Sequence, residues 1–425
     1  MMLTGLDDGG SDTVSPVRLL SEHMPHAMTV SVGVWVSAGS RWEAPEDGGA
    51  CHFLEHVVFR GAGPYSASAL NRRMDLLGGR ANAFTTKDAT CFHMELLPED
   101  LAEGLALLAA MTQEPLIRDD DVESERQVIL QEIRTTRDNP ADLARDLCLR
   151  ACWGSHPLSR PILGTEETVG RLTPEALRRF HADSYLSANM VVAAAGPVAE
   201  AELTGAVSEA FLPAEYQGRR EHQAVPEFAG DRKGAGRPLD LVHLVMAVPG
   251  VAATSDDLAA VSVIAAMLGG GFGSRLFQEI REKRGWAYRV DSTPLVYRDG
   301  GILPVYAAVP PGRAADVVGL VQDELARVAA GDFLPEEFDL ARKRTVRRLA
   351  MGMETVRSRM LRLGRVGLGL GRTEAAEETA RRLGAFSFEG FRALARRRLG
   401  ASRMAVGAVG AASVLETIGI DPGGP

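Results

Sequence analysis

The second half of this 425-residue chain repeats the first half at an offset of 214 residues. Each copy has an expected helix, over 174–182 and over 388–398, followed by a short apolar strand that ends in glycine. The strand-like stretch 29–36 falls on 243–250 under the same offset. The aligned identities are Arg178 with Arg392, Met190 with Met404, Val192 with Val406, Ala194 with Ala408 and Gly196 with Gly410. The repeat predicts two domains with the same fold.

The order of the expected elements indicates an α+β fold in each half. Each half opens with a strand, inserts helices, and returns with strands over 80–97 and 294–309. Strands adjacent in sequence, with helices gathered between them, favour a mostly antiparallel sheet. The segment 214–238 is polar, contains glycine and proline, and has no apolar period, so we predict a linker there between domains 1–213 and 239–425. Domains of roughly 200 residues can each bury a core.

The run HFLEH, from His52 to His56, carries the strongest chemical signal in the chain. On a helix, His52 and His56 lie one turn apart on one face and can bind one metal ion. Glu55 lies beside them and can take a proton from a water molecule that the metal activates. This is the inverted form of the zinc-peptidase signature; the alternative is a helix with two ordinary histidines. Under the offset of 214, the second half has Ala266, Gly269 and Gly270 at these positions.

A helix further along the chain offers carboxylates to the same metal. Zinc in hydrolases usually takes three protein ligands and leaves a fourth position for water. The segment 119–137 is predicted to be an amphipathic helix with an acidic first turn. Glu125 and Glu132 are two turns apart and therefore lie on one side of it. The residues alone leave open whether these two serve a metal or belong to a solvated face.

These motifs together resemble the pitrilysin, insulin-degrading enzyme and mitochondrial processing peptidase family, in which HFLEH is followed after 75 residues by a ligating glutamate. The resemblance implies that Glu132 is the third ligand and that Glu125 supports the site without ligating. It also implies one zinc ion per chain. Under the offset of 214, Glu132 falls on Val346, so we expect the second domain to keep the fold without metal ligands.

Further segments extend the resemblance along nearly the whole chain. The segment GGRANAFT, 78–85, is similar to the family's edge strand that holds substrate, which implies substrate-binding roles for Asn82, Ala83 and Phe84. The segment 274–288 is similar to the one in which the family places an Arg and a Tyr seven residues apart, here Arg281 and Tyr288. Other matching segments are 38–43 (AGSRWE), 156–158, 162–165 and 269–271. The departures are Cys51, Phe272, Gly273 and Trp286.

The resemblance implies two homologous α/β-roll domains that face each other across a cavity, and a zinc-dependent endopeptidase for short or unfolded peptides. Glu55 would act as general base. Tyr288 would donate to the oxyanion, with Arg281 holding the tyrosine or the substrate. The alternatives are a non-catalytic scaffold or peptide-binding subunit, and an active subunit that requires a different partner chain. Chains of this length in the family usually pair, which implies a homodimer or a heterodimer with a related chain.

Composition limits the partners and the compartment. With 47 basic and 56 acidic side chains the net charge is −9, which argues against a nucleic-acid partner. No apolar run has the length of a membrane span, and residues 1–10 have neither a basic n-region nor an apolar h-region. A cytoplasmic protein is therefore expected. The four cysteines have no CxxC spacing, which favours packing over metal binding or disulfides.

Overall fold

The computed structural model describes residues 17–212, 224–371, 375–400 and 403–423. The chain forms two compact units. Unit 1 comprises Met1–Ile133, Pro161–Gln223 and Gly352–Thr373, and unit 2 comprises Arg134–Arg160, Ala224–Met351 and Glu374–Pro425. Each unit contains helices and one mostly antiparallel sheet, so the predicted α+β class is confirmed. Within the described ranges, no helix is both long and apolar enough to cross a membrane.

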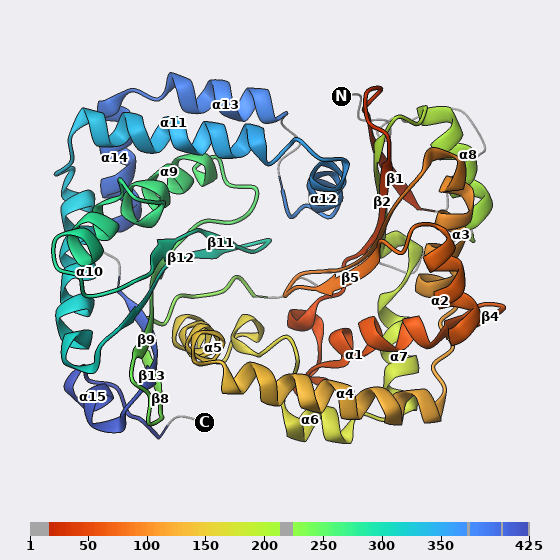
Figure 1. Cartoon of the computed structure of the whole chain (residues 1–425), viewed down its shortest axis with the longest axis horizontal. Coiled ribbons are helices and arrows are strands. Elements are labelled where there is room, and N and C mark those ends of the chain that lie inside the picture. The colour runs from red at the N-terminus through yellow and green to blue at the C-terminus, as the bar shows by residue number, and fades with distance from the viewer. Residues whose placement is uncertain (1–16, 213–223, 372–374, 401–402, 424–425) are drawn as a thin grey trace. The chain divides into compact units, whose positions relative to one another are not determined.

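The sheet of unit 1 has five strands in the order β1-β7-β2-β6-β5. Figure 1 labels three of them, β1, β2 and β5. Their bounds are β1 (Arg18–His23), β2 (Val30–Val36), β5 (Ala81–Thr85), β6 (Thr90–Leu96) and β7 (Met190–Gly196). Every residue of β2 and of β7 is buried, as expected of inner strands with both faces covered. Only β1 and β7 run parallel, and β5 forms the opposite edge. A short hairpin, β3 (Gly61–Ala62) with β4 (Tyr65–Ser66), lies outside this sheet.

Helices cover both faces of this sheet because its strands are apolar on both sides. Val30, Val32 and Val34 of β2 turn to a core that seven helices complete. Trp35 turns to the other face, where Met360 and Leu363 of α12 (Val356–Gly367) complete a second core. The seven helices are α1 (Ala50–Val57), α2 (Ala67–Leu76), α3 (Leu101–Gln113), α4 (Asp119–Asp138), α6 (Glu166–Arg171), α7 (Pro174–Ser184) and α8 (Glu200–Ala210).

The sheet of unit 2 repeats the same strand order and directions. It runs β8-β13-β9-β12-β10, with β8 and β13 parallel and the other pairs antiparallel. The bounds are β8 (Arg232–Gly236), β9 (Val242–Pro249), β10 (Val290–Ser292), β12 (Gly301–Val309) and β13 (Ala405–Gly410), while β11 (Leu295–Val296) also pairs with β12. Each strand of the five-stranded sheet of unit 1 thus has a counterpart in unit 2. This agrees with the duplication inferred from the sequence.

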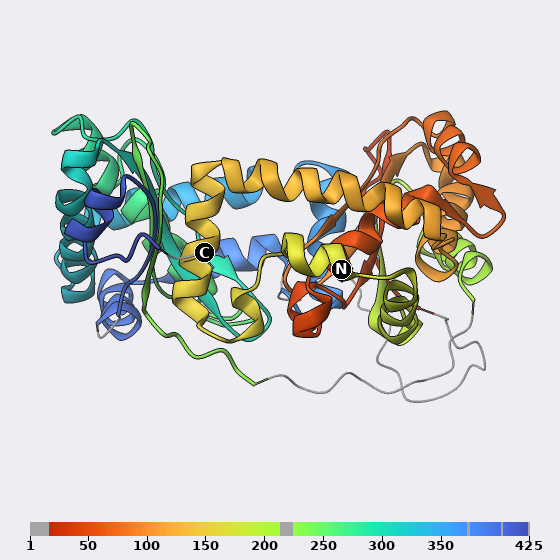
Figure 2. The ribbon, with the colours of Figure 1, turned by 90° about the horizontal axis from the view of Figure 1, so that it is seen from below.

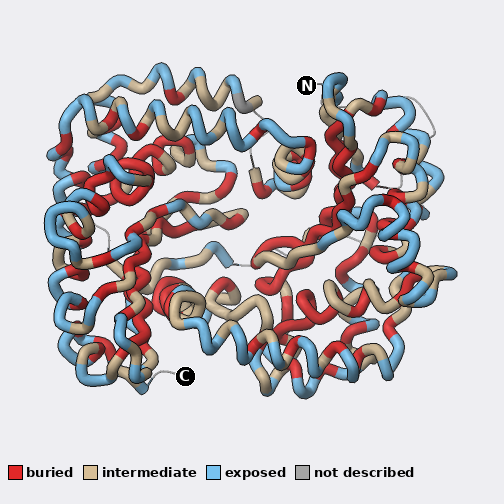
Figure 3. The backbone as a smooth tube through the Cα atoms, viewed as in Figure 1, coloured by how far each residue is buried: buried red, intermediate tan, exposed pale blue. Residues whose placement is uncertain are grey.

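The sheet of unit 2 also has a core on each face, and Figure 3 shows the strands of both sheets as largely buried. One core is completed by α9 (Leu258–Gly269), α10 (Ala314–Ala330), α11 (Pro335–Met351), α13 (Ala376–Ala385), α14 (Phe388–Leu399) and α15 (Ala412–Thr417). The other face is covered by α5 (Pro140–Trp153), whose Ala144 and Cys148 pack against Val245 and Val409. The short helix α6 (Glu166–Arg171) belongs to unit 1.

Two helices pack on the sheet of the other half of the chain, so the compact units differ from the contiguous domains 1–213 and 239–425. The chain passes through α4, one continuous helix, into α5, which belongs to unit 2 (Figure 2). Conversely, α12 lies in the second half of the chain but belongs to unit 1. An apolar period locates a helix but does not say which sheet it covers, because the same stripe fits either one.

The predicted linker 214–238 is corrected over Arg232–Gly236, which forms β8. Its sequence, RKGAG, is polar and glycine-rich, so it lacks the alternation that indicates a strand. Gly234 is required there because a Cβ would lie 2.4 Å from the Ile420 side chain. The offset of 214 places Arg18, the first residue of β1, on Arg232, so the repeat contained the missing signal. Residues 214–223 of the predicted linker lie outside the described residues.

Candidate metal centre

The helix that carries the histidines begins at a turn that a glycine and a buried carboxylate hold in place. Gly49 precedes α1 with a φ of +97°, and a Cβ there would lie 2.7 Å from the carbonyl oxygen of Leu163. The α1 helix has no side-chain cap at this residue. Instead, the buried carboxylate of Glu43 accepts hydrogen bonds from the backbone N–H groups of Gly49 at 2.9 Å and Cys51 at 2.8 Å. Glu43 therefore holds the first turn of the helix immediately before His52.

The structure brings His52, His56 and Glu132 together. The Nε2 atoms of both histidines lie 3.6 Å from Oε2 of Glu132, and one donor atom from each residue lies within 4.8 Å of the others. Donors about 2.1 Å from a tetrahedral zinc ion are about 3.4 Å apart, so the spacing is close to what zinc requires. Two imidazoles and one carboxylate are also a donor set found in zinc hydrolases. The residues present therefore fit zinc.

The expected helix over 119–137 is observed as α4, and its two glutamates have different surroundings. Glu132 is half-exposed and reaches the histidines. Glu125 is buried, lies 3.0 Å from Nδ1 of His56, and forms an ion pair with Arg60. The bond from His56 Nδ1–H to Glu125 leaves Nε2 with its lone pair directed to the ligand group. Glu125 thus lies behind His56, where it could orient a ligand, and Arg60 holds Glu125; the supporting role of Glu125 stays a prediction.

Burial and charge place the two histidines in different protonation states. Burial lowers the pKa of His52 to about 4, and the neighbouring His56 adds to this effect. Burial also opposes charge on His56, but hydrogen bonds and charges of Glu125 and Glu132 outweigh it and raise its pKa to about 9. The His56 imidazole, 3.6 Å away, lowers the pKa of Glu132. His52 is ready to ligate, whereas His56 must exchange its proton for the metal.

Glu55 joins the metal-binding helix to the edge of the sheet. The Oγ1 hydroxyl of Thr85, the last residue of β5, donates a hydrogen bond of 2.5 Å to Oε2 of Glu55. Burial raises the pKa of Glu55. A carboxylate with a raised pKa is a better proton acceptor near neutral pH than an ordinary glutamate. Glu55 therefore has the chemistry of a general base and lies against the strand expected to hold substrate.

The expected edge strand is confirmed as β5, with bounds Ala81–Thr85. Within the described residues no strand pairs with its outer edge. Ala83 packs with the core on the α1 side, and Phe84 packs on the opposite side with Trp35. Asn82 is exposed, and its Oδ1 accepts a hydrogen bond from the N–H of Ala83. An open edge can accept another strand, so the substrate-binding role of these residues stays a prediction.

Arg281 and Tyr288 lie together in unit 2. Arg281 belongs to the π-helical turn η7 (Phe277–Glu282), and its guanidinium carbon lies 4.9 Å from the centre of the Tyr288 ring. The Tyr288 side chain is 84% exposed, so its hydroxyl is accessible. Cation–π contact of this kind restrains a tyrosine without using its hydroxyl. The part of both residues in a reaction at the metal stays a prediction.

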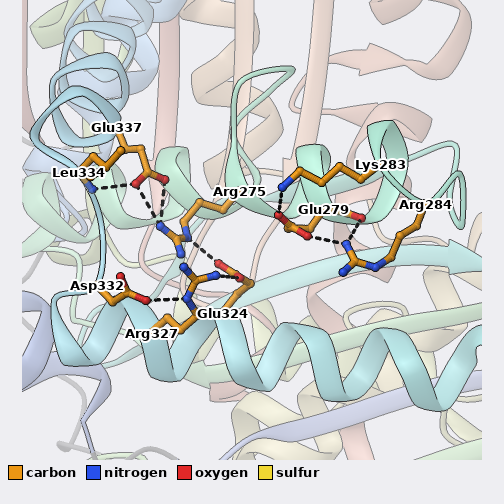
Figure 4. A network of polar contacts seen from close by, with 9 residues as sticks. All are labelled: Arg275, Glu279, Lys283, Arg284, Glu324, Arg327, Asp332, Leu334 and Glu337. Atoms are coloured by element: carbon orange, nitrogen blue, oxygen red, sulfur yellow. Dashed lines mark hydrogen bonds and ion pairs between the residues drawn. The ribbon is translucent and has the colours of Figure 1, made fainter.

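Ion pairs hold the segment around Arg281 (Figure 4). Arg275 is buried and donates to Glu324 at 2.5 Å and to Glu337 at 2.9 Å. Glu279 accepts from Lys283 and Arg284, both at 2.5 Å. Buried pairs are costly to break because the remaining charge loses its partner. Arg275 and Glu279 thus anchor the segment that carries Arg281, a role that spacing did not indicate.

Three residues of the site were missed by sequence reasoning. Glu43 lies in the AGSRWE segment, where resemblance marked it but assigned no role. Thr85 closes the GGRANAFT segment, and Arg60 follows His56 by four residues, one helical turn. Thr85 and Arg60 act through Glu55 and Glu125, which are distant in sequence, and Glu43 acts through the backbone N–H groups of Gly49 and Cys51, which a side-chain pattern does not reveal.

Comparisons with known proteins agree with this fold and site. The family model "Insulinase (Peptidase family M16)" matches residues 18–166, and the model "Peptidase M16 inactive domain" matches 171–345. An uncharacterized zinc protease of Mycobacterium leprae is 38% identical over 390 residues, 90% of this chain and 87% of that protein. The uncharacterized zinc protease YmxG of Bacillus subtilis is 31% identical over 380 residues, 89% of this chain and 93% of that protein.

Solved structures share the fold. A protease from Helicobacter pylori superposes with a TM-score of 0.84 at 18% identity, covering 93% of this chain and 97% of that chain. A peptidase M16 inactive domain from Pseudomonas fluorescens gives 0.83 at 23% identity, covering 94% and 97%. Fold and site together define the class as zinc peptidases with the inverted histidine motif. The chain belongs to the insulinase family, peptidase family M16, as a short two-domain member.

Proposed function

We propose that this protein is a zinc-dependent endopeptidase that hydrolyses peptide bonds in short or unfolded peptides. The observation that carries the proposal is the meeting of His52, His56 and Glu132 beside Glu55, which is itself bonded to the open edge strand β5. Zinc held by the three ligands would polarise the peptide carbonyl and lower the pKa of a water molecule. Relatives named zinc proteases support the same chemistry.

Glu55 is the proton carrier in this proposal. Its raised pKa favours uptake of a proton from the attacking water, and the protonated carboxyl can then pass the proton to the leaving amine. The short hydrogen bond from Thr85 keeps Oε2 in place while the other carboxylate oxygen remains available. Glu55 therefore moves protons without being a ligand.

Strand addition would position the substrate. An extended peptide paired with β5 would place its backbone beside Asn82 and its scissile bond near Glu55, which Thr85 ties to the strand end. Such binding reads the main chain and excludes segments already paired in a folded protein. Tyr288, restrained by Arg281, would supply a hydroxyl donor to the oxyanion, so we propose that both units take part. We also propose that two chains pair, each with its own zinc.

The test combines metal analysis with cleavage. Wild type should hold about one zinc ion per chain and cut an unstructured peptide of about 20–30 residues, and a chelator should stop it. Glu55→Gln should retain zinc and lose turnover, whereas Glu132→Ala should lose the zinc. A compact, disulfide-bonded protein containing the same segment should stay intact.

Two outcomes would change the proposal. Equal cutting of the peptide and the compact protein would contradict strand addition. Zinc binding without cutting of either substrate would favour a scaffold, or a subunit that needs a different partner chain.

A further inference from the structure

Arg357 carries a positive charge, and among the described residues no acidic side chain forms an ion pair with it. It lies in the first turn of α12, directly after the cap Thr355 and Val356, and it is exposed. Its guanidinium forms a hydrogen bond with His93, whose Nε2 lies 3.4 Å from Nη2 of Arg357. By contrast, Arg359 on the same helix forms an ion pair with Glu22. Two arginines of one helix therefore differ in having an acidic partner.

His93 does not neutralise this charge. It is 3% exposed, and burial, together with the charge of Arg357, lowers its pKa to about 4. At neutral pH its ring is uncharged, so Nε2 accepts a hydrogen bond from the guanidinium and Nδ1 carries the proton. The α12 helix contains four arginines and no acidic residue. A cation in the first turn also opposes the helix dipole, so this placement gains nothing from the helix itself.

The sheet register places Arg357 beside the face of the edge strand. His93 of β6 is directly opposite Asn82 of β5, and directly opposed residues share a face of the sheet. Phe84 lies two residues further along β5 on the same face, with its ring centre 6.1 Å from that of His93. Alternate residues of a strand added to β5 would point to this face. Those side chains would be the ones near Arg357.

We propose that Arg357 determines specificity by selecting substrates that carry an Asp or Glu side chain at the position facing α12 beside Asn82 and Phe84. The inference rests on the proposed function, because it requires a peptide strand on β5. The guanidinium can bind a carboxylate through two parallel N–H donors, and the neutral ring of His93 restrains its orientation. The methylene groups of a glutamate would pack on Phe84. Neighbouring substrate positions point to the opposite face and should show no such preference.

The experiment is a glutamate scan. Unstructured peptides of one sequence would carry Glu or Gln at each of four consecutive positions around the mapped cleavage site, and kcat/KM would be measured for each pair. Wild type should prefer Glu over Gln by roughly five- to tenfold at one position, or at two positions two residues apart, and the preference should shrink as salt is added.

The variants separate Arg357 from general charge effects. Arg357→Gln should bring the Glu to Gln ratio to about one, Arg357→Lys should retain part of it, and Arg357→Glu should reverse it. Arg362→Gln is the matched control, because it removes the same charge from another side of the same helix and should leave the ratio unchanged. Zinc content and thermal unfolding should be equal in all variants. A ratio near one in wild type, or a ratio kept by Arg357→Gln, would overturn the inference while leaving a peptidase.

Binding distinguishes failure of the inference from failure of the proposed function. The same labelled peptides would be titrated by fluorescence anisotropy into Glu55→Gln with and without Arg357→Gln. Tighter binding of the Glu peptide that disappears with Arg357→Gln supports the inference even if wild type turns nothing over. Absence of both cleavage and binding would overturn the inference together with the proposed function.

Discussion

At the residue scale, the contacts behind the ligands decide how well the site works. Glu125 accepts from His56 and is held by Arg60, so a carboxylate and a cation together fix one imidazole. Among the described residues, Nδ1 of the buried His52 has no such partner. In the described part of the chain, a carboxylate therefore lies behind His56 and not behind His52, so we expect the two histidines to contribute unequally to metal binding.

Glu125→Gln should weaken zinc binding by about 10- to 100-fold without removing a ligand, because an amide orients and polarises the imidazole less than a carboxylate does. Competition against a fluorescent chelator measures the affinity. Glu123→Gln is the control, since Glu123 is exposed on the same helix and, within the described ranges, its hydrogen bonds are with its neighbours Arg126 and Gln127. Equal affinity in wild type and Glu125→Gln would show that this carboxylate does not support the metal.

Glu43 should make stability depend on pH. Burial raises its pKa to about 7 from an ordinary 4.5, although the N–H groups of Gly49 and Cys51 oppose the shift. A raised pKa means that the folded state favours the protonated Glu43 carboxyl. The contribution of this protonation to the free energy of unfolding is complete below about pH 4.5 and is lost as pH rises through about 7. In metal-free protein, the unfolding free energy of wild type minus that of Glu43→Gln should fall across this window and level off above it. Urea unfolding from pH 4.5 to 8 measures it; a flat difference would contradict the buried carboxyl.

At the element scale, the two helices that pack on the other half's sheet decide the architecture. The α5 helix approaches β13 closely enough to require glycine, because a Cβ at Gly407 would lie 2.3 Å from the carbonyl oxygen of Ala144 and from the N atom of Cys148. The α12 helix likewise approaches β2, where a Cβ at Gly364 would overlap the ring of Trp35. Backbone and ring contacts this close leave no room for an added side chain.

Gly407→Ala should destabilise the protein by at least about 1–3 kcal/mol, because the clash is with backbone that cannot rotate away. The midpoint of urea unfolding checks this. Gly319→Ala is the control, since Gly319 lies in α10 and an added Cβ meets no heavy atom within 4 Å in the described part of the chain. The control should be neutral or slightly stabilising, by about 0.4–1 kcal/mol. Equal stability of wild type and Gly407→Ala would mean that α5 can move off β13.

At the scale of the whole molecule, each half of the chain depends on the other, because α5 and α12 each pack on the sheet of the opposite half. Residues 1–213 alone lack α12, so the face of the sheet with Trp35 and Val191 would lose its cover. Residues 224–425 alone lack α5, which covers Val245 and Val409. The two units are therefore compact without being independent segments of the chain.

A chain cut within 213–223 should fold only when both pieces are present. The fragment 1–213 should expose apolar surface and unfold at a much lower urea concentration, because burial of apolar area on one sheet face is lost. Co-expression of both fragments should restore cooperative unfolding, zinc binding and any cleavage. Binding of a hydrophobic dye and urea midpoints measure the effect. A fragment 1–213 with the stability of the full chain would contradict it.

Features that depend on local spacing or on the order of elements could be predicted from the amino-acid sequence. The helical repeat places His52 and His56 one turn apart, and the order of the expected strands and helices, together with the offset of 214, predicted two related, mostly antiparallel sheets. Tertiary contacts decided that Glu132 meets the histidines, which the residues alone had left open, that Arg60 holds Glu125, and that α5 and α12 pack on the sheets of the opposite halves of the chain. The physical reason is that local periodicity fixes which face of an element is apolar, whereas the element it packs against depends on contacts between residues far apart in the chain.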